Sequence, residues 1–215
     1  CLPGANCGGC GYAGCGGYAE AVLNGEAEIG KCASGGNECA QAMAAIMGVK
    51  ADKVERQVAL VLCSGQRSFD TDGNQITGAR VKGVYEGFKD CLSASKVAGR
   101  GHLVCKYGCL GFGSCMKACK YDAIKVVDGV ARVNPNKCTG CMSCAAACPR
   151  GIITSIPYDH HVVVACASHA KGAVTVRGCS QGCIGCGLCA KVCPTGAISF
   201  RNNRSYIDLE KCIRC

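Results

Sequence analysis

Residues 138–149 read CTGCMSCAAACP, with four cysteines at intervals of three, three and four residues and a proline directly after the last. The two short intervals let a tight loop wrap three corners of a small iron–sulfide cube, with backbone N–H groups pointing at its sulfurs. The longer interval puts Cys148 on a helical turn facing away, and Pro149 stops that helix. The stretch therefore predicts three thiolate ligands for one [4Fe-4S] cluster and one ligand for a neighbouring cluster.

A second copy of this spacing, CIGCGLCAKVCP, occupies residues 183–194. The spacing is that of the bacterial ferredoxin run, in which the fourth cysteine ligates the other cluster of a two-cluster unit. Each run therefore needs a partner run elsewhere in the chain.

The partner of the first run lies upstream and is irregular, because Phe112 stands where Cys186 stands in the later run. The middle ligand is missing, and Cys105, four residues before Cys109, is the obvious substitute. Cys179 occupies the equivalent place in the second copy, where it is not needed.

The connections between motifs also repeat, since 19 residues separate one motif from the next in both copies. Residues 123–133 predict two short strands about Asp128-Gly129, and residues 197–208 predict the same about Asn202-Asn203. The chain thus contains the two-cluster ferredoxin layout twice.

Crossed ligation assigns the cysteines of these runs to four clusters. The predicted sets are Cys105, Cys109, Cys115 and Cys148; Cys119, Cys138, Cys141 and Cys144; Cys183, Cys186 and Cys189; and Cys193, Cys212 and Cys215. Each of the last two sets lacks one ligand, which we expect just past residue 215.

The N-terminal segment carries a different glycine-rich pattern, with cysteines at Cys7, Cys10, Cys15 and Cys32. Glycine lets the backbone wrap closely around an inorganic core. Short helices are predicted over 18–23 and 39–47. A [4Fe-4S] cluster is the favoured ligand, and a closed all-thiolate zinc site is the alternative. With this site, three clusters are fully liganded within the chain and two are incomplete.

Six cysteines remain outside these sets: Cys1, Cys39, Cys63, Cys91, Cys166 and Cys179. Two of them end similar apolar runs, Cys63 after 58–62 and Cys166 after 162–165, so they look like copies. The favoured interpretation is a buried thiol that behaves as a small hydrophobic side chain. An additional cluster that uses Cys63 and Cys91 is the alternative, and disulfides are the least favoured.

Composition excludes several classes of protein. Cysteine makes up 24 of 215 residues, tryptophan is absent and phenylalanine occurs four times, so a conventional apolar core is thin and clusters must help hold the fold together. The formal charge of +9 assumes neutral thiols, but a four-thiolate cubane carries about −2, which removes most of it. The basic residues are scattered without stacking aromatic residues, so no nucleic-acid partner is predicted. No apolar run is long enough to span a membrane.

The predicted fold class is α+β: a small N-terminal iron–sulfur domain followed by tandem two-[4Fe-4S] ferredoxin-like units with little conventional core. The predicted division is 1–50 for the N-terminal domain, 51–104 for a connecting segment with a strand, 105–155 for the first two-cluster unit, 156–178 for a second connecting segment and 179–215 for a truncated second unit.

The order of these motifs resembles a known family. LPGANCGGCGYAGCGGYAEAV from residue 2, CKYGCLGFGSC from 105, CTGCMSCAAACP and GCIGCGLCAKVCPTGAI resemble the B subunit of the Rnf complex, the ion-translocating ferredoxin:NAD oxidoreductase of bacterial membranes, in its long clostridial-type form. The resemblance covers nearly the whole chain, and the opening pattern is its specific part. It implies a fragment that lacks an N-terminal membrane helix, a body at the cytoplasmic face of the membrane, electrons from reduced ferredoxin or flavodoxin, and the other Rnf subunits with their flavins as acceptors. Phe112 and Lys120 depart from the plain ferredoxin run.

The function expected from sequence is therefore a non-catalytic electron-relay subunit, with no residue acting as acid, base or nucleophile. One alternative is a polyferredoxin that serves a soluble hydrogenase or a bifurcating flavoenzyme. Another is an interaction module held together by zinc.

Overall fold

Short helices and short strands make up this protein, whose computed structural model describes residues 1–160 and 162–215. Within those residues the strands form four separate two-stranded antiparallel sheets. The helices are 4 to 12 residues long. The mixed helix and strand content predicted from sequence is confirmed. Because the helices and strands are short, much of the chain lies in loops, which can carry cysteines.

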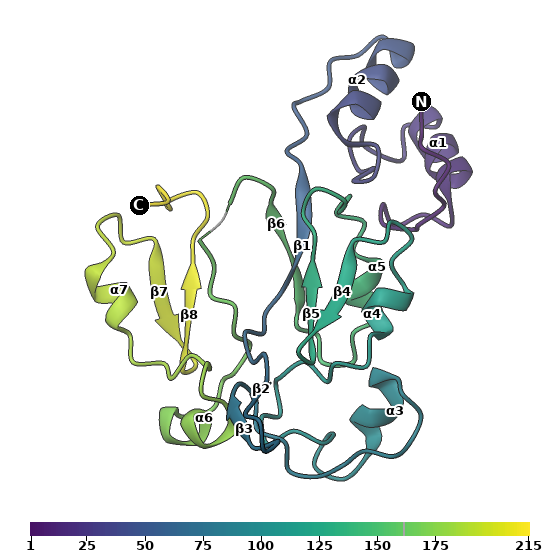
Figure 1. Cartoon of the computed structure of the whole chain (residues 1–215). Helices are drawn as coiled ribbons and strands as arrows, with labels where there is room; N and C mark the ends of the chain where they lie inside the picture. Colours follow the sequence, from purple (N-terminus) through teal and green to yellow (C-terminus); the bar gives the residue numbers. More distant parts are fainter. Residues whose placement is uncertain (161) are drawn as a thin grey trace.

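Two helices form the N-terminal domain, drawn in purple and blue at the top of Figure 1. They are α1 (Cys15–Leu23) and α2 (Gly36–Met47), and the fully buried ring of Tyr18 lies in their small core. The Tyr18 hydroxyl donates to the Glu28 carbonyl at 2.9 Å and accepts the Lys31 N–H at 3.2 Å. Tyr18 therefore fixes the loop after α1, which leads to the last cysteine of this domain.

Both N-terminal helices begin three residues before the predicted ranges of 18–23 and 39–47. The start of α1 depends on a distant residue, because Asn6 Oδ1 accepts the N–H of Cys15 at 2.8 Å. The end of α2 follows the usual rule, since Gly48 adopts the left-handed conformation with φ 66°.

The first predicted hairpin is present as β4 (Ile124–Val127) and β5 (Val130–Val133). Its turn residues, Asp128 and Gly129, have φ values of 49° and 74°. Two consecutive positive φ angles are the requirement of a two-residue type I′ turn, so the Asp-Gly signal is confirmed.

The second predicted hairpin is present as β7 (Ile198–Arg201) and β8 (Arg204–Ile207). Asn202 and Asn203 form its turn with φ values of 50° and 57°. Asparagine tolerates this conformation better than most residues, which is why the pair takes the place of Asp-Gly. Figure 1 shows this hairpin apart from the central strands, next to α7 (Leu188–Val192).

A long-range strand pair closes the first unit. Strand β1 (Gln57–Val61) pairs antiparallel with β6 (Ile153–Pro157), and Figure 1 shows β1 beside β5. The segment 51–104, predicted to be a connection, thus supplies a strand to the unit predicted to begin at 105. The core on this strand pair is small and includes Val58, Val61, Ile124, Val130, Ile152 and Ile153.

Two one-turn helices follow the cysteine loops of the first unit. They are α4 (Ser114–Lys117) and α5 (Ser143–Ala146). Each is preceded by a residue in the left-handed region, Gly113 with φ 74° and Met142 with φ 58°. This sharp turn directs the chain so that the cysteine inside each helix is buried.

The rest of the segment 51–104 lies below the central strands in Figure 1. It contains the hairpin β2 (Ser68–Phe69) and β3 (Gln75–Thr77), followed by α3 (Cys91–Lys96). Helix α3 begins at Cys91 because Asp90 Oδ1 accepts the N–H of Ser93 at 2.9 Å, an N-cap.

The second connecting segment contains α6 (Gly172–Gly178). Residues 162–165, which copy the apolar run of β1 in sequence, are not in a strand. Only an isolated antiparallel bridge joins the two copies, between Cys63 and Cys166. A strand needs a paired neighbour, and the first copy has one in β6.

Candidate iron–sulfur sites

Three cavities of similar size are each lined by four or more cysteines. Each is small and narrow. Most of their other lining residues are apolar or glycine. Four thiols around one small cavity fit the donor set of a [4Fe-4S] cluster.

The N-terminal cavity brings together the four cysteines predicted there: Cys7, Cys10, Cys15 and Cys32. Its wall is a loop in which Asn6, Gly8 and Gly11 have φ values of 45°, 73° and 88°. Burial is the main cause that raises the pKa of Cys32, and the thiols of Cys10, Cys15 and Cys7 raise it further. The thiols are therefore close enough to repel one another as anions, and a cluster's positive iron core would relieve this repulsion.

Cys7 differs from its neighbours because its thiolate is stabilised. Burial raises the pKa of Cys7, but the Gly9 N–H, the Ser34 hydroxyl and the positive charge of Lys120 together bring it below its ordinary value. The Cys7 and Ser34 side chains are 3.5 Å apart. Hydrogen bonds of this kind tune the potential of a bound cluster.

The lining of a second cavity differs from one predicted ligand set. It is lined by Cys91, Cys109, Cys115 and Cys148, whereas the sequence assigned Cys105 to the last three. Burial raises the pKa of Cys115 to about 12, and the thiols of Cys109, Cys91 and Cys148 contribute.

The cause of this correction is the position of α3. The N–H of Cys91 donates to Ser114 Oγ at 2.8 Å, which ties the start of α3 to the start of α4. Phe112 stacks with Tyr85 and His102 at ring-centroid distances of 5.3 and 5.1 Å, so its ring belongs to the packing. Proximity in sequence favoured Cys105, but Cys91, which lies 18 residues before Cys109, lines the cavity instead.

The third group is the predicted set Cys119, Cys138, Cys141 and Cys144. Burial raises the pKa of Cys144 to about 11, and the thiols of Cys138, Cys141 and Cys119 contribute. Backbone N–H groups point at the sulfurs: Ala59 donates to Cys138 at 3.3 Å and Ala123 donates to Cys119 at 3.4 Å. Crossed proximity is therefore present, with Cys119 beside the later run and Cys148 beside the earlier one.

The remaining one of the three cavities is lined by four cysteines that the sequence analysis did not group together: Cys63, Cys105, Cys166 and Cys179. Three of them were predicted to be isolated buried thiols, and the alternative paired Cys63 with Cys91. Cys63 and Cys91 line different cavities. A signal for this group existed, because Cys63 and Cys166 end matching apolar runs and Cys105 and Cys179 hold matching places before their motifs.

The C-terminal cysteines are more open. Cys186, Cys189 and Cys215 are exposed, while Cys183, Cys193 and Cys212 are half-buried. Cys189 Sγ lies 3.1 Å from Ser205 Oγ. The Thr195 hydroxyl is the main cause that lowers the pKa of Cys193, outweighing the effect of burial. The two sets predicted to be incomplete thus lie on the surface of the described chain.

Apart from the C-terminal cysteines, two cysteines remain outside the four groups. Cys39 is buried in the N-terminal core, where its sulfur lies 3.9 Å from Met43 Sδ, as expected of a small hydrophobic side chain. Cys1 is exposed.

A zinc site needs four sulfurs grouped closely around one ion. Zinc–sulfur bonds of about 2.3 Å place the four sulfurs of a tetrahedral site within about 4 Å of one another. Within residues 1–160 and 162–215, no three His, Cys, Asp or Glu side chains are close enough together to hold a single metal ion.

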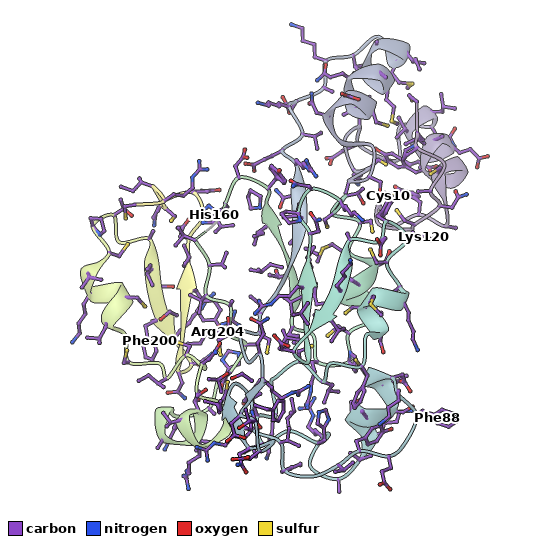
Figure 2. All side chains as sticks on the ribbon, in the orientation of Figure 1. Cys10, Phe88, Lys120, His160, Phe200 and Arg204 are labelled. Atoms are coloured by element: carbon purple, nitrogen blue, oxygen red, sulfur yellow. The ribbon has the colours of Figure 1, made fainter. Side chains whose placement is uncertain are left out.

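The groups lie next to one another along the fold. Cys141 of the third group also lines the N-terminal cavity. Lys120 Nζ donates to the carbonyls of Ala5 and Asn6 at 3.1 and 3.2 Å, and Figure 2 shows Cys10 and Lys120 close together where the N-terminal domain meets the central unit. The N-terminal site therefore faces the third group directly.

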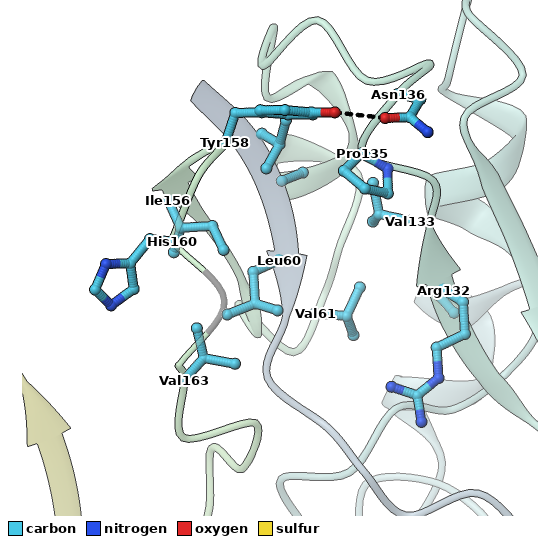
Figure 3. A pocket seen from close by; sticks show the side chains of 13 residues that line it. Leu60, Val61, Arg132, Val133, Pro135, Asn136, Ile156, Tyr158, His160 and Val163 are labelled. Atoms are coloured by element: carbon cyan, nitrogen blue, oxygen red, sulfur yellow. Dashed lines mark hydrogen bonds between the residues drawn. The ribbon is translucent and has the colours of Figure 1, made fainter. Parts of the chain in front are cut away.

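A larger cavity contains no cysteine. It lies over β1, β5 and β6 and is lined mainly by apolar side chains (Figure 3). The Tyr158 hydroxyl donates to Asn136 Oδ1 at 2.6 Å at its rim, and the Arg56 guanidinium lies 4.1 Å from the centre of the Tyr158 ring. This hollow is distinct from the thiol groups.

Comparison with family descriptions matches the same cysteine motifs. Residues 2–34 match the family described as "Putative Fe-S cluster", and residues 131–154 and 182–199 match "4Fe-4S binding domain". The 4Fe-4S character of the ferredoxin-type runs is thus confirmed. Cysteines 63, 91, 105, 109, 115, 119, 166 and 179 lie outside the matched residues.

Three relatives align with all of this chain, and each is the B subunit of an ion-translocating complex. The relative from the Na(+)-translocating ferredoxin:NAD(+) oxidoreductase complex of Acetobacterium woodii is 43% identical over 215 residues, and the chain spans 62% of its length. That from the ion-translocating oxidoreductase complex of Methanosarcina acetivorans is 40% identical, with 78% of its length covered. That from the proton-translocating ferredoxin:NAD(+) oxidoreductase complex of Clostridium ljungdahlii is 40% identical over 216 aligned residues, with 72% covered.

Across residues 1–160 and 162–215, none of the helices has the length and apolar character that crossing a bilayer requires. The identity over the full chain and the matching cysteine motifs agree with one another. The chain therefore belongs to the family of B subunits of ion-translocating oxidoreductase complexes, the Rnf family that its motifs resemble.

Proposed function

We propose that this chain is an electron-relay subunit, which accepts single electrons from reduced ferredoxin or flavodoxin and passes them to the membrane and flavin subunits of an ion-translocating ferredoxin:NAD oxidoreductase. The names of its relatives support this role, since two of the three describe ferredoxin:NAD(+) oxidoreductases. The relay works at the cytoplasmic face of the membrane, as part of a complex with the other subunits.

The proposed carriers are [4Fe-4S] clusters on three complete ligand sets. The sets are Cys7, Cys10, Cys15 and Cys32; Cys91, Cys109, Cys115 and Cys148; and Cys119, Cys138, Cys141 and Cys144. Cys183, Cys186 and Cys189, and Cys193, Cys212 and Cys215, belong to two further clusters. A bound cluster supplies the one-electron chemistry.

The chain's own residues set the path and the potentials. Cys115 and Cys119 are four residues apart yet belong to different sets, so one helical turn separates two carriers. N–H groups such as that of Ala59 on Cys138 stabilise charge on sulfur, and burial opposes it. No proton donor, base or nucleophile enters the mechanism.

The observation that carries the proposal is the succession of thiol groups from the N-terminal cavity through Cys141 to the second cavity, each next to the following one. A succession of carriers in contact is what a relay needs. An enzyme active site would instead need a substrate cavity with convergent polar groups.

The experiment is anaerobic purification of the full-length protein, followed by iron and acid-labile sulfide counting and EPR during stepwise reduction by reduced ferredoxin. We expect a broad visible absorbance that bleaches as ferredoxin donates electrons. Re-adding the protein to membranes depleted of this subunit should restore ferredoxin-dependent NAD reduction. A colourless folded protein, or one zinc per four-cysteine site, contradicts the proposal.

A further inference from the structure

The cavity formed by Cys63, Cys105, Cys166 and Cys179 has no role in the ligand sets above. None of these four cysteines falls in the residues matched by the family descriptions. All four line one cavity, together with small or apolar residues such as Ala79, Gly108 and Gly182. Four independent buried thiols would not be expected to converge on one space.

The two sequence repeats contribute equivalent pairs to this cavity. Cys63 and Cys166 each end the apolar run that precedes a unit, and they face each other in an antiparallel bridge. Cys105 and Cys179 each stand four residues before the first cysteine of a motif. Each repeat therefore supplies two thiols to the boundary between the repeats: one at the end of its apolar run and one just before its cysteine motif.

The surroundings of these sulfurs resemble those of cluster ligands. The Cys109 N–H donates to Cys63 Sγ at 3.4 Å. Backbone N–H groups of Tyr107 and Gly108 point at the Cys105 thiol, and that of Gln181 points at Cys179. N–H donors stabilise thiolates that iron binds, and a merely apolar thiol does not need them.

The backbone is also packed as closely as a cluster pocket requires. A Cβ added to Gly65 would lie 3.0 Å from Ala79 Cβ and 3.4 Å from Cys179 Sγ. A Cβ added to Gly182 would lie 2.5 Å from Thr175 Cγ2. These glycines let two loops close on the same space.

We propose that Cys63, Cys105, Cys166 and Cys179 bind an additional [4Fe-4S] cluster at the boundary between the two ferredoxin-like repeats. Four thiols that line one cavity are the donor set of such a cluster. The reduced, unpaired state of all four cysteines leaves every sulfur available to iron.

The position of this cluster gives it a task that rests on the proposed relay function. On one side, Cys63 accepts the N–H of Cys109, a ligand of the second cavity. On the other side, Gly182 lines the cavity and directly precedes Cys183, the first cysteine of the C-terminal run. One electron enters from one repeat and one leaves to the other, without transfer of protons or atoms.

The test is a Cys63→Ala/Cys179→Ala variant of the full-length chain, which removes one ligand of each repeat. Cys39→Ala is the matched control, because Cys39 is a buried cysteine outside every proposed set. We expect the variant to lose about four irons and four sulfides per chain relative to the control, and its Mössbauer spectrum to lose one four-iron component. Unchanged iron, or the loss of one zinc in its place, overturns the cluster.

Two further measurements test the existence of the cluster and its role in electron transfer separately. Iron and Mössbauer analysis of the single variant Cys166→Ala, whose side chain is half-buried, repeats the test if the double variant does not fold. Stopped-flow reduction by ferredoxin is expected to divide the remaining clusters of the variant into a fast and a slow population, at least tenfold apart. If the variant loses four irons but its reduction kinetics do not change, the cluster site is supported and its role in transfer between the repeats is refuted. If ferredoxin does not reduce even the control, the relay function itself is contradicted.

Discussion

The contact between the N-terminal domain and the third cysteine group can be tested at one glycine. A Cβ added to Gly9 would lie 2.6 Å from the carbonyl oxygen of Cys141 and 3.1 Å from its Cα. Ordinary van der Waals contact begins at about 3.4 Å, so Gly9→Ala must push the two loops apart by about 0.8 Å. Both partners are backbone, and no side-chain rotation can relieve the clash.

The expected cost of this overpacking is about 1–3 kcal/mol. That free energy corresponds to a shift of about 5- to 150-fold in the equilibrium between the docked and undocked N-terminal domain. The four ligands of the N-terminal cavity all lie within the domain, so its iron content should not change.

Hydrogen exchange of the two facing loops, residues 7–11 and 139–142, measures the docking in the full-length protein. Gly9→Ala should accelerate exchange there by the factor given above. Gly17→Ala is the matched control, since nothing lies within 4 Å of an added Cβ and its place in α1 favours alanine by about 0.5–1 kcal/mol. Equal exchange in the two variants would show that the close approach of Gly9 to Cys141 is wrong.

Three further predictions concern the ligand sets and the docking surface. Cys91→Ser should remove one to four irons per chain, and the added substitution Phe112→Cys should restore them by completing the ferredoxin run; unchanged iron in the single variant contradicts the assignment. Lys120→Met removes two hydrogen bonds to N-terminal carbonyls and should weaken docking by about 0.5–1.5 kcal/mol, seen by the same exchange measurement, while Lys117→Met should not. The association rate with reduced ferredoxin should fall as ionic strength rises, because exposed basic side chains beside the cluster loops, such as Lys106 and Lys117, attract an acidic partner locally; stopped-flow rates that do not depend on salt exclude this attraction.

The local features of the fold were predictable from sequence. Asp128-Gly129 and Asn202-Asn203 require positive φ angles that few other residues adopt, so both hairpins follow from short-range chemistry. The crossed grouping of Cys119 with the later run follows from the spacing alone. Both predictions depend only on residues close in sequence or on a fixed motif.

Long-range features were not predictable in the same way. The pairing of β1 with β6 joins residues more than 90 positions apart, and its register is decided by burial of a shared apolar face. Cys91 reaches the second cavity only because Ser114 Oγ accepts its N–H across two helix starts. Cys105 was grouped with Cys109 because the two are close in the chain, whereas the structure has Cys105 lining another cavity.

The sequence separation of the ligands has a consequence for how the holoprotein is assembled. The N-terminal set spans 26 residues, from Cys7 to Cys32, and can be complete while most of the chain is still being synthesised. The set at the repeat boundary needs Cys179 and closes a loop of more than 110 residues, whose entropic cost exceeds that of the short loop by about 1–2 kcal/mol. We therefore expect maturation to proceed from the amino terminus, and we expect a shortage of iron or sulfide to leave the proposed site between the repeats unfilled first, which would interrupt electron transfer between them.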